Sequence, residues 1–244
     1  MKECVEAENE HIIQNWEPLE FNIDEKYKYV PKGPIFKFFS NLVYYGIAFP
    51  ILKIVTKIVY DLKIEDKENI RKLSGGAISV SNHVLILDCA MVGLASGLKK
   101  IYYTTLEDSF KIPFVRKLIK LLRALPIPKD ITNKKHFINE VNHLLQTGNI
   151  VHVYPEVALW PYCDRIRNFK SGAFTFAVNN NVPVVPIVIK FREPKGIRKL
   201  FKKKKDVTLT VLKPIMQEQS EDRKQDIEEL KNKVYEAMQK ISEN

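Results

Sequence analysis

A histidine and an aspartate five positions apart, His83 and Asp88, are the residues of this sequence best suited to chemistry. In a regular helix they would lie about 140° apart around the axis and would not meet. If His83 occupies the turn after a strand over Ala77–Ser81, and Asp88 the first turn of the next helix, the side chains can touch. The carboxylate would then orient the imidazole and stabilise its protonated form, which predicts a general base acting on a hydroxyl group. The alternative is a structural histidine beside the sheet, with Asp88 as a favourable helix-start charge.

A glutamate follows the next apolar strand pattern. The run Ile150–Tyr154 leads into Tyr154-Pro155-Glu156, and the carboxyl end of a parallel strand is where α/β proteins bind ligands. The loop beyond it is basic and leads into Ser171-Gly172, and flexible cations beside a glycine suit a phosphate group. The cations of this loop are Arg165, Arg167 and Lys170. Both patterns can also be purely structural, as a strand-end turn and a solvated loop.

In order and spacing, these patterns resemble the glycerolipid acyltransferase family, whose type member is 1-acylglycerol-3-phosphate acyltransferase. The family carries a His-x-x-x-x-Asp block, a Phe-Pro-Glu-Gly-Thr-Arg block, a Lys-x-Gly element and a Val-Pro-Val-x-Pro block. The corresponding segments are Asn82–Asp88, Tyr154-Pro155-Glu156, Lys170-Ser171-Gly172 and Val182–Pro186, with Leu125–Lys129 in the place of a further block. The resemblance covers roughly residues 40–215.

The chain departs from the family pattern after Glu156, where Val157-Ala158-Leu159 replaces Gly-Thr-Arg. The resemblance implies that the family arginine binds the phosphate of the acceptor, so that ligand is missing here. Lys129 also stands where the family usually has arginine, and lysine binds phosphate as a point charge without bidentate geometry. Either a cation of the basic loop binds the phosphate, or the acceptor is not lysophosphatidic acid.

The resemblance implies an O-acyltransferase that moves a fatty acyl group from acyl-coenzyme A or acyl-carrier protein to the hydroxyl of a lysophospholipid such as 1-acylglycerol-3-phosphate. His83 would remove the hydroxyl proton, Asp88 would orient His83, and backbone amides near the next helix start would stabilise the oxyanion. Substrate would be positioned by further residues, namely Asn82, Lys129, Glu156, Arg165, Arg167, Lys170 and Gly172. Attack on a thioester needs no metal or other cofactor, so we expect none. An apolar channel would hold the acyl chain.

Three other classes remain open. A lipid or thioester hydrolase could use the same histidine to activate water, although no Gly-x-Ser-x-Gly elbow is present for a serine version. A lipid-binding relative without catalysis fits the altered glutamate block, but the presence of both His83 and Asp88 disfavours it. A nucleic-acid binder fits the isoelectric point of about 9.3. The sequence has no motif of that class, and its aromatic residues cluster away from the basic stretches, so we expect no nucleic acid partner.

The charge is uneven and indicates an anionic membrane as a partner. The net charge is +10, but residues 1–25 hold eight acidic side chains and one basic one, so the remainder carries +17. Polybasic surfaces are attracted to anionic lipid, and Lys199, Lys202–Lys205 and the basic helix from Pro113 are candidates for the contact. The alternative is a solvated lysine-rich surface. We expect a peripheral protein at the cytoplasmic face of the membrane, with reduced cysteines and no signal peptide.

Residues 35–60 are the most apolar part of the chain. A spanning helix needs about twenty consecutive apolar residues, and the clean run Leu42–Leu52 falls short. Because Pro50 should kink the segment and lysines interrupt it, we predict two short amphipathic helices in the membrane interface. A helical hairpin packed on the body is the alternative.

After residue 70 the pattern alternates between strands and helices. It predicts an α/β fold with a mixed, mainly parallel central sheet flanked by helices and preceded by an N-terminal apolar helical hairpin. The predicted strands are Ala77–Ser81, Ile101–Thr105, Ile150–Tyr154, Val182–Ile189 and Val207–Leu212. Helices are predicted from Pro113, over Asn133–Thr147 and Gly172–Asn179, and after a Ser220 cap. The expected parts are an acidic arm (1–34), membrane-interface helices (35–66) and an α/β acyltransferase domain (67–244).

Overall fold

The structure is a computed structural model of the 244-residue chain. It describes Ile23 and residues 27–111, 113–196, 198–201, 205–218 and 220–243. Most of the predicted acidic arm and of the run Lys202–Lys205 lies outside the described residues.

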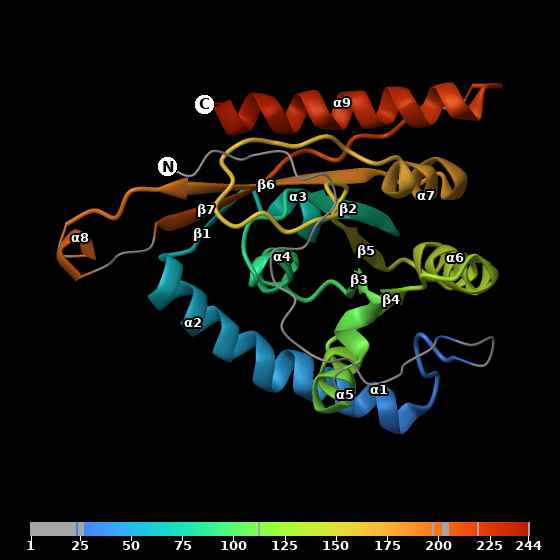
Figure 1. Ribbon diagram of the computed structural model, residues 1–244, viewed down its shortest axis with the longest axis horizontal. Coiled ribbons are helices and arrows are strands. Elements are labelled where there is room, and N and C mark those ends of the chain that lie inside the picture. Colours follow the sequence, from blue (N-terminus) through green and yellow to red (C-terminus); the bar gives the residue numbers. More distant parts are fainter. Residues whose placement is uncertain are drawn as a thin grey trace.

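Seven strands form one sheet in the order β1-β7-β6-β2-β5-β3-β4 (Figure 1). The strands are β1 (Lys63–Glu65), β2 (Ala77–Ser81), β3 (Ile101–Leu106), β4 (Ala124–Ile127), β5 (Ile150–Val153), β6 (Val184–Arg192) and β7 (Asp206–Val211). All neighbouring strands are parallel except β6 and β7, which are antiparallel. The prediction of a mixed, mainly parallel sheet is therefore confirmed. Every residue of β2 is buried, as expected for a strand covered on both faces.

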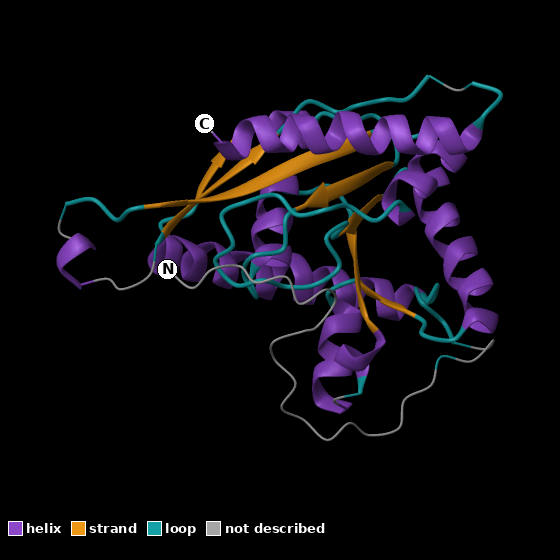
Figure 2. Ribbon diagram, turned by 45° about the horizontal axis from the view of Figure 1, so that its top comes forward, coloured by secondary structure: helices purple, strands orange, loops and turns teal. Residues whose placement is uncertain are grey.

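Helices cover both faces of this sheet. They are α1 (Pro34–Asn41), the π-helical η1 (Leu42–Ala48), α2 (Phe49–Tyr60), α3 (Glu68–Arg71), α4 (Asp88–Ser96), the 3₁₀ turn η2 (Glu107–Phe110), α5 (Pro113–Leu121), α6 (Ile131–Gln146), α7 (Gly172–Asn180), α8 (Arg198–Phe201) and α9 (Arg223–Glu243). α6, α7 and α9 pack on one face around Phe174 and Leu230. α2, α3 and α4 pack on the other around Ile70 and Met91. Figures 1 and 2 show α9 running along β6.

The apolar N-terminal region is one helix, so the predicted hairpin is wrong. α1, η1 and α2 follow one another without a break from Pro34 to Tyr60. The π-helical turn explains how the chain passes Pro50. A proline lacks an N–H and crowds the carbonyl four residues earlier. At the end of η1 the amide of Phe49 donates a hydrogen bond to the carbonyl of Tyr44, five residues earlier. This wider turn relieves the crowding around the proline ring.

This helix lies along the body of the protein. Ser40, Tyr44, Thr56 and Tyr60 are its buried residues. Its outer face carries exposed apolar side chains, namely Ile35, Phe38, Phe39, Leu42, Ile47, Ile51, Ile54 and Ile58. By length and composition alone the helix could cross a membrane, with a mean hydropathy of 1.6 over its most apolar window. One packed face and one exposed face make it amphipathic, which suits a helix lying in an interface.

Three local features differ from the sequence prediction. β1 pairs with β7, although its residues fall in the range 35–66 assigned to membrane-interface helices. β4 was not predicted as a strand, and its Pro126 is tolerated because β4 is an edge strand. Asp222, not Ser220, caps α9, because its Oδ1 accepts hydrogen bonds from two amides of the first turn.

Candidate active site

His83 and Asp88 lie at the carboxyl end of β2, where the chain turns into α4. Nδ1 of His83 is 3.0 Å from Oδ2 of Asp88. The same oxygen accepts hydrogen bonds from the amides of Val84 and Leu85, at 2.7 and 3.0 Å. The carboxylate therefore holds both the ring and the turn that carries it. This arrangement leaves Nε2 as the nitrogen available to a substrate.

Burial dominates the electrostatics of Asp88, which has no exposed surface. Burial raises the pKa of this carboxyl above its ordinary value, while the hydrogen bonds from His83 and the turn act in the opposite direction. Its second oxygen, Oδ1, has no hydrogen-bond partner among the described residues. The amides of Val84 and Leu85 are engaged by Asp88, so they are not free to stabilise an oxyanion in this state.

Tyr154 covers one face of the histidine. The ring centroids of Tyr154 and His83 are 3.9 Å apart and the planes differ by 16°. Tyr154 follows β5, the strand beside β2. Burial raises the pKa of its phenol well above the ordinary value, so the group stays neutral. The imidazole is therefore held at its edge by Asp88 and at its face by Tyr154.

Glu156, predicted to position the acceptor, contacts the protein itself. Its Oε2 accepts hydrogen bonds from the amide of His83 at 3.1 Å and from Nη2 of Arg167 at 2.8 Å. Its Oε1 accepts one from the amide of Arg167 at 2.9 Å. Burial raises the pKa of this carboxyl, and the charge of Arg167 is the largest opposing influence. Glu156 thus joins the turn after β5 to the His83 turn.

Arg167 points inward from the basic loop. Its guanidinium also donates to the carbonyl of Ala158 and lies over the ring of Trp160, 4.5 Å from the centroid. Only 11% of its side chain is exposed. Of the three loop cations considered as phosphate ligands, Arg167 is engaged in this ion pair, whereas Arg165 and Lys170 are exposed.

The other predicted substrate ligands lie apart from this cluster or serve the backbone. The side-chain amide of Asn82 exchanges two hydrogen bonds of 2.9 Å with the backbone of Ile189 and so extends the pairing of β2 with β6. Nζ of Lys129 lies 2.7 Å from a carboxylate oxygen of Asp108. Gly172 begins α7, is exposed and has open space where a Cβ would be.

An apolar cavity of about 470 Å³ opens beside His83. It lies between α2, α4, α5 and β3, and both His83 and Tyr154 line it. Its apolar wall includes Phe49, Leu52, Leu94, Val115 and Ile119. Leu159, which stands where the family pattern has arginine, belongs to this wall. The substitution therefore replaces a cation by part of an apolar surface.

Three residues that the sequence analysis missed shape this cavity. The hydroxyls of Tyr44 and Tyr103 are hydrogen-bonded to each other at 2.8 Å, and both residues line the cavity. Gly93 of α4 lies against them, because an added Cβ would be 2.5 Å from the Tyr103 hydroxyl and 2.8 Å from that of Tyr44. A glycine inside an apolar helix was the only sequence signal of this close approach.

Comparisons with known proteins identify related chains. The family model described as Acyltransferase matches residues 61–190. The chain is 30% identical over 132 residues to the chloroplastic 1-acyl-sn-glycerol-3-phosphate acyltransferase LPAT1 of Arabidopsis thaliana, covering 53% of this chain and 36% of that protein. It is 28% identical over 190 residues to the chloroplastic 1-acyl-sn-glycerol-3-phosphate acyltransferase BAT2 of Brassica napus, covering 75% and 52%. The chain thus spans about half or less of the length of these two relatives.

A solved structure has a similar fold. The crystal structure of the 1-acyl-sn-glycerophosphate acyltransferase PlsC from Thermotoga maritima matches with a TM-score of 0.58 and 21% identity, over 86% of this chain and 92% of that one. The family model spans more than half of the chain and includes His83, Asp88, Glu156 and Arg167. The chain therefore belongs to the acyltransferase family.

Proposed function

We propose that this protein transfers a fatty acyl group from a thioester to the free hydroxyl of 1-acylglycerol-3-phosphate or a closely related lysophospholipid, in phospholipid biosynthesis. The observation that carries the proposal is the His83–Asp88 pair, held at 3.0 Å beside an apolar cavity. Membership of the acyltransferase family supports acyl transfer. The names of the two plant relatives support the acceptor.

The geometry supports direct transfer of the acyl group from the thioester to the acceptor hydroxyl. Nε2 of His83 accepts the proton of the acceptor hydroxyl as the hydroxyl oxygen attacks the thioester carbonyl. A C–O bond forms, the tetrahedral intermediate collapses with cleavage of the C–S bond, and the imidazolium returns its proton to the departing thiolate. Asp88 stabilises the imidazolium while it exists. No acyl-enzyme is required, and the step is complete without a metal ion.

The cavity beside His83 suits the acyl chain of the donor, either acyl-coenzyme A or acyl-carrier protein. Each methylene buried there contributes about 0.8 kcal/mol, so the length of the cavity influences which donor binds. The hydrogen-bonded pair Tyr44–Tyr103 lies in its wall and is a candidate for the group that limits chain length.

The acceptor phosphate needs cations that a ligand can reach from solvent. Arg167 is held by Glu156, and Leu159 is apolar. Arg165 and Lys170 remain exposed on the same loop and are the proposed phosphate ligands. Lys129, paired with Asp108, would have to exchange its partner to take part.

We further propose that the protein is peripheral on the cytoplasmic face of an anionic membrane. The exposed apolar face of α1, η1 and α2 would lie in the interface, next to a body with a large positive charge. Replacing Phe38, Phe39 and Ile58 by serine should abolish flotation with vesicles. Unchanged flotation of this variant would contradict the assignment of this face.

Replacement of the candidate base and its partner tests the transfer reaction. His83→Ala and Asp88→Asn should each lower thiol release from acyl-coenzyme A in the presence of lysophosphatidic acid, the former by about 10²-fold or more. His143→Ala, an exposed histidine on α6, is the matched control and should keep full activity. Mass spectrometry of an acceptor panel identifies the product. Undiminished transfer in His83→Ala, or free fatty acid without any acylated acceptor, would overturn the proposal.

A further inference from the structure

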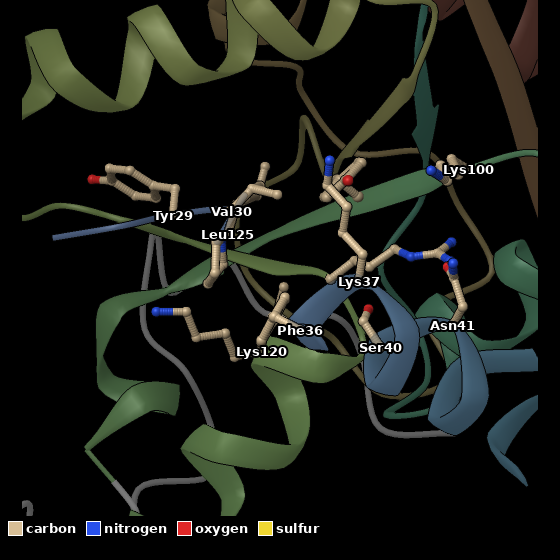
Figure 3. Close-up of a pocket in the computed structure, with 13 residues that line it drawn as sticks. Tyr29, Val30, Phe36, Lys37, Ser40, Asn41, Lys100, Lys120 and Leu125 are labelled. Atoms are coloured by element: carbon tan, nitrogen blue, oxygen red, sulfur yellow. The ribbon is translucent and has the colours of Figure 1, made fainter. Parts of the chain in front are cut away.

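A second, smaller cavity lies between the N-terminal helix and the amino ends of β3 and β4 (Figure 3). Its volume is about 50 Å³. Four cationic residues line it, namely Lys37, Lys100, Lys120 and Arg123, and its lining contains no acidic residue from the described part of the chain. His83 lies beyond the carboxyl end of the parallel strand β2, so this cavity is at the opposite end of the strands from the candidate active site.

Arg123 is a buried cation whose hydrogen-bond partners are neutral. Only 5% of the residue is exposed. Its guanidinium donates to the hydroxyl of Tyr45 at 3.2 Å and to Oδ1 of Asn41 at 2.9 Å, and lies over the rings of Tyr44 and Tyr45. No carboxylate of the described residues pairs with it. Buried charges are normally paired, so the charge of Arg123 calls for an anion.

The lysines place further positive charge around the cavity. Figure 3 shows the side chain of Lys37 above Ser40, and that of Lys100 above Asn41. The ammonium of Lys120 lies over the ring of Tyr27, 4.4 Å from the centroid. Lys37 and Lys100 take part in no ion pair within the portion of the chain that is described. They are therefore free to bind a ligand together with Arg123.

We propose that Lys37, Lys100 and Arg123 bind a phosphate group in this cavity. One water needs about 10–15 Å³ of such space, so the cavity has room for a tetrahedral oxyanion and not for a larger ligand part. Lysine ammonium groups and a guanidinium are the usual donors to phosphate oxygens. The phosphate belongs either to the headgroup of an anionic lipid or to a soluble phosphate ester, and the recognising chemistry is the same.

The bound phosphate links two parts of the protein. Lys37 belongs to α1, whereas Lys100 and Arg123 belong to the body. Without an anion the three cations repel one another, and with one they are drawn together. The same N-terminal helix supplies Phe49 and Leu52 to the acyl cavity. Phosphate binding therefore stabilises the wall of that cavity, whatever the reaction catalysed at His83.

Thermal unfolding of the full chain in sodium phosphate and in sodium chloride of equal ionic strength tests the site. Phosphate should raise the unfolding midpoint in a saturable manner, and Lys37→Gln/Lys100→Gln should lose this response. Lys53→Gln/Lys72→Gln removes the same charge from exposed lysines elsewhere and should keep it. No difference between phosphate and chloride would exclude inorganic phosphate as a ligand.

Flotation distinguishes the lipid source from the soluble one. Vesicles of phosphatidylcholine alone are compared with vesicles that also contain phosphatidic acid. A lipid phosphate in the site predicts about tenfold weaker binding of Lys37→Gln/Lys100→Gln to the phosphatidic acid vesicles than of the control pair. A response to inorganic phosphate alone identifies a soluble ester. Equal behaviour of the two double variants in both experiments would overturn the proposal.

Discussion

The carboxylate of Glu156 accepts a hydrogen bond from the backbone amide of His83, although the two residues are 73 positions apart. The same carboxylate is paired with Arg167, so a buried ion pair lies directly behind the turn that presents the imidazole. The position of His83 therefore depends on this pair as well as on Asp88. Substitutions behind the turn should affect catalysis and stability together.

Breaking this ion pair should be strongly destabilising. Glu156→Gln leaves a buried guanidinium unpaired, and Arg167→Met leaves a buried carboxylate unpaired, so each should cost about 3 kcal/mol of unfolding free energy. The double variant should cost much less than the sum of the two. Urea denaturation of the four proteins measures this coupling. Additive losses would show that the two side chains do not act as a pair.

The stacking of Tyr154 on His83 predicts a difference between two replacements. Tyr154→Phe keeps the ring and should retain activity within a few-fold of the parent, since the hydroxyl has no hydrogen-bond partner among the described residues. Tyr154→Ala frees one face of the imidazole and should lower kcat by about tenfold or more, because misplaced catalytic groups are costly. Steady-state kinetics with acyl-coenzyme A provides the measurement. Equal activity of the two variants would refute the positioning role.

Val157 occupies a strained backbone conformation next to the ion pair. Its φ is +67°, in the left-handed region that a β-branched residue rarely adopts, and its side chain is exposed. Val157→Gly should raise the unfolding free energy by about 0.5–1 kcal/mol, because glycine adopts this conformation without a steric penalty. Ile138→Gly, at an exposed position of helix α6, is the control and should be destabilising by a similar amount. Chemical denaturation measures the unfolding free energy of both variants, which should rise in Val157→Gly and fall in the control. A fall in Val157→Gly would contradict the prediction.

Much of the fold followed from local patterns. β2, β3, β5, β6 and β7 were predicted because their apolar runs end at turn residues. β1 has only three residues on an edge of the sheet and carries no recognisable period. The continuity of the N-terminal helix depends on a π-helical turn before Pro50, which no single-residue propensity encodes.

Part of the candidate active site could also be predicted from local sequence patterns. The spacing of His83 and Asp88, together with the strand before them, predicted that they would meet. Spacing could not show that Arg167 turns inward to Glu156 while Arg165 stays exposed, because this choice depends on tertiary packing. The close approach of Gly93 to Tyr44 and Tyr103 could not be predicted either, because these residues are distant from it in sequence.

His152 should make stability depend on pH. It is fully buried between the hydroxyls of Ser79 and Ser81, and burial lowers its pKa to about 3. The unfolded chain binds a proton below about 6.5 and the folded chain does not, so stability present above that pH is lost as the pH falls toward 3. At about 1.4 kcal/mol per pKa unit, the loss approaches about 5 kcal/mol.

His152→Gln should flatten this dependence between pH 6.5 and 3, as measured by urea denaturation at several pH values. His143→Gln replaces an exposed histidine and should leave the slope of the parent protein unchanged. An undiminished slope in His152→Gln would assign the acid sensitivity to other groups.

Gly93→Ala should narrow the apolar cavity beside His83, where we propose that the acyl chain binds. The new methyl group would press on the hydroxyls of Tyr44 and Tyr103, so these rings must move. We expect a shift toward shorter acyl donors, with about a fourfold loss for each methylene that no longer fits. Gly75→Ala, where a Cβ meets no neighbour, should keep the parent preference. The measurement is a competition between acyl donors of different chain length, with the products read by mass spectrometry. An unchanged chain-length preference in Gly93→Ala would contradict the prediction.

The helix from Pro34 to Tyr60 has an outer face that is exposed and apolar, while residues of its inner side line the cavity beside His83. Removing the helix to obtain a more tractable protein would also open the cavity and expose its apolar wall to water. A truncated protein would then be a poor substitute for the full chain in ligand soaking or inhibitor screening. Any compound that enters this cavity would contact the helix and the body at once, so its potency would report how firmly the two are joined.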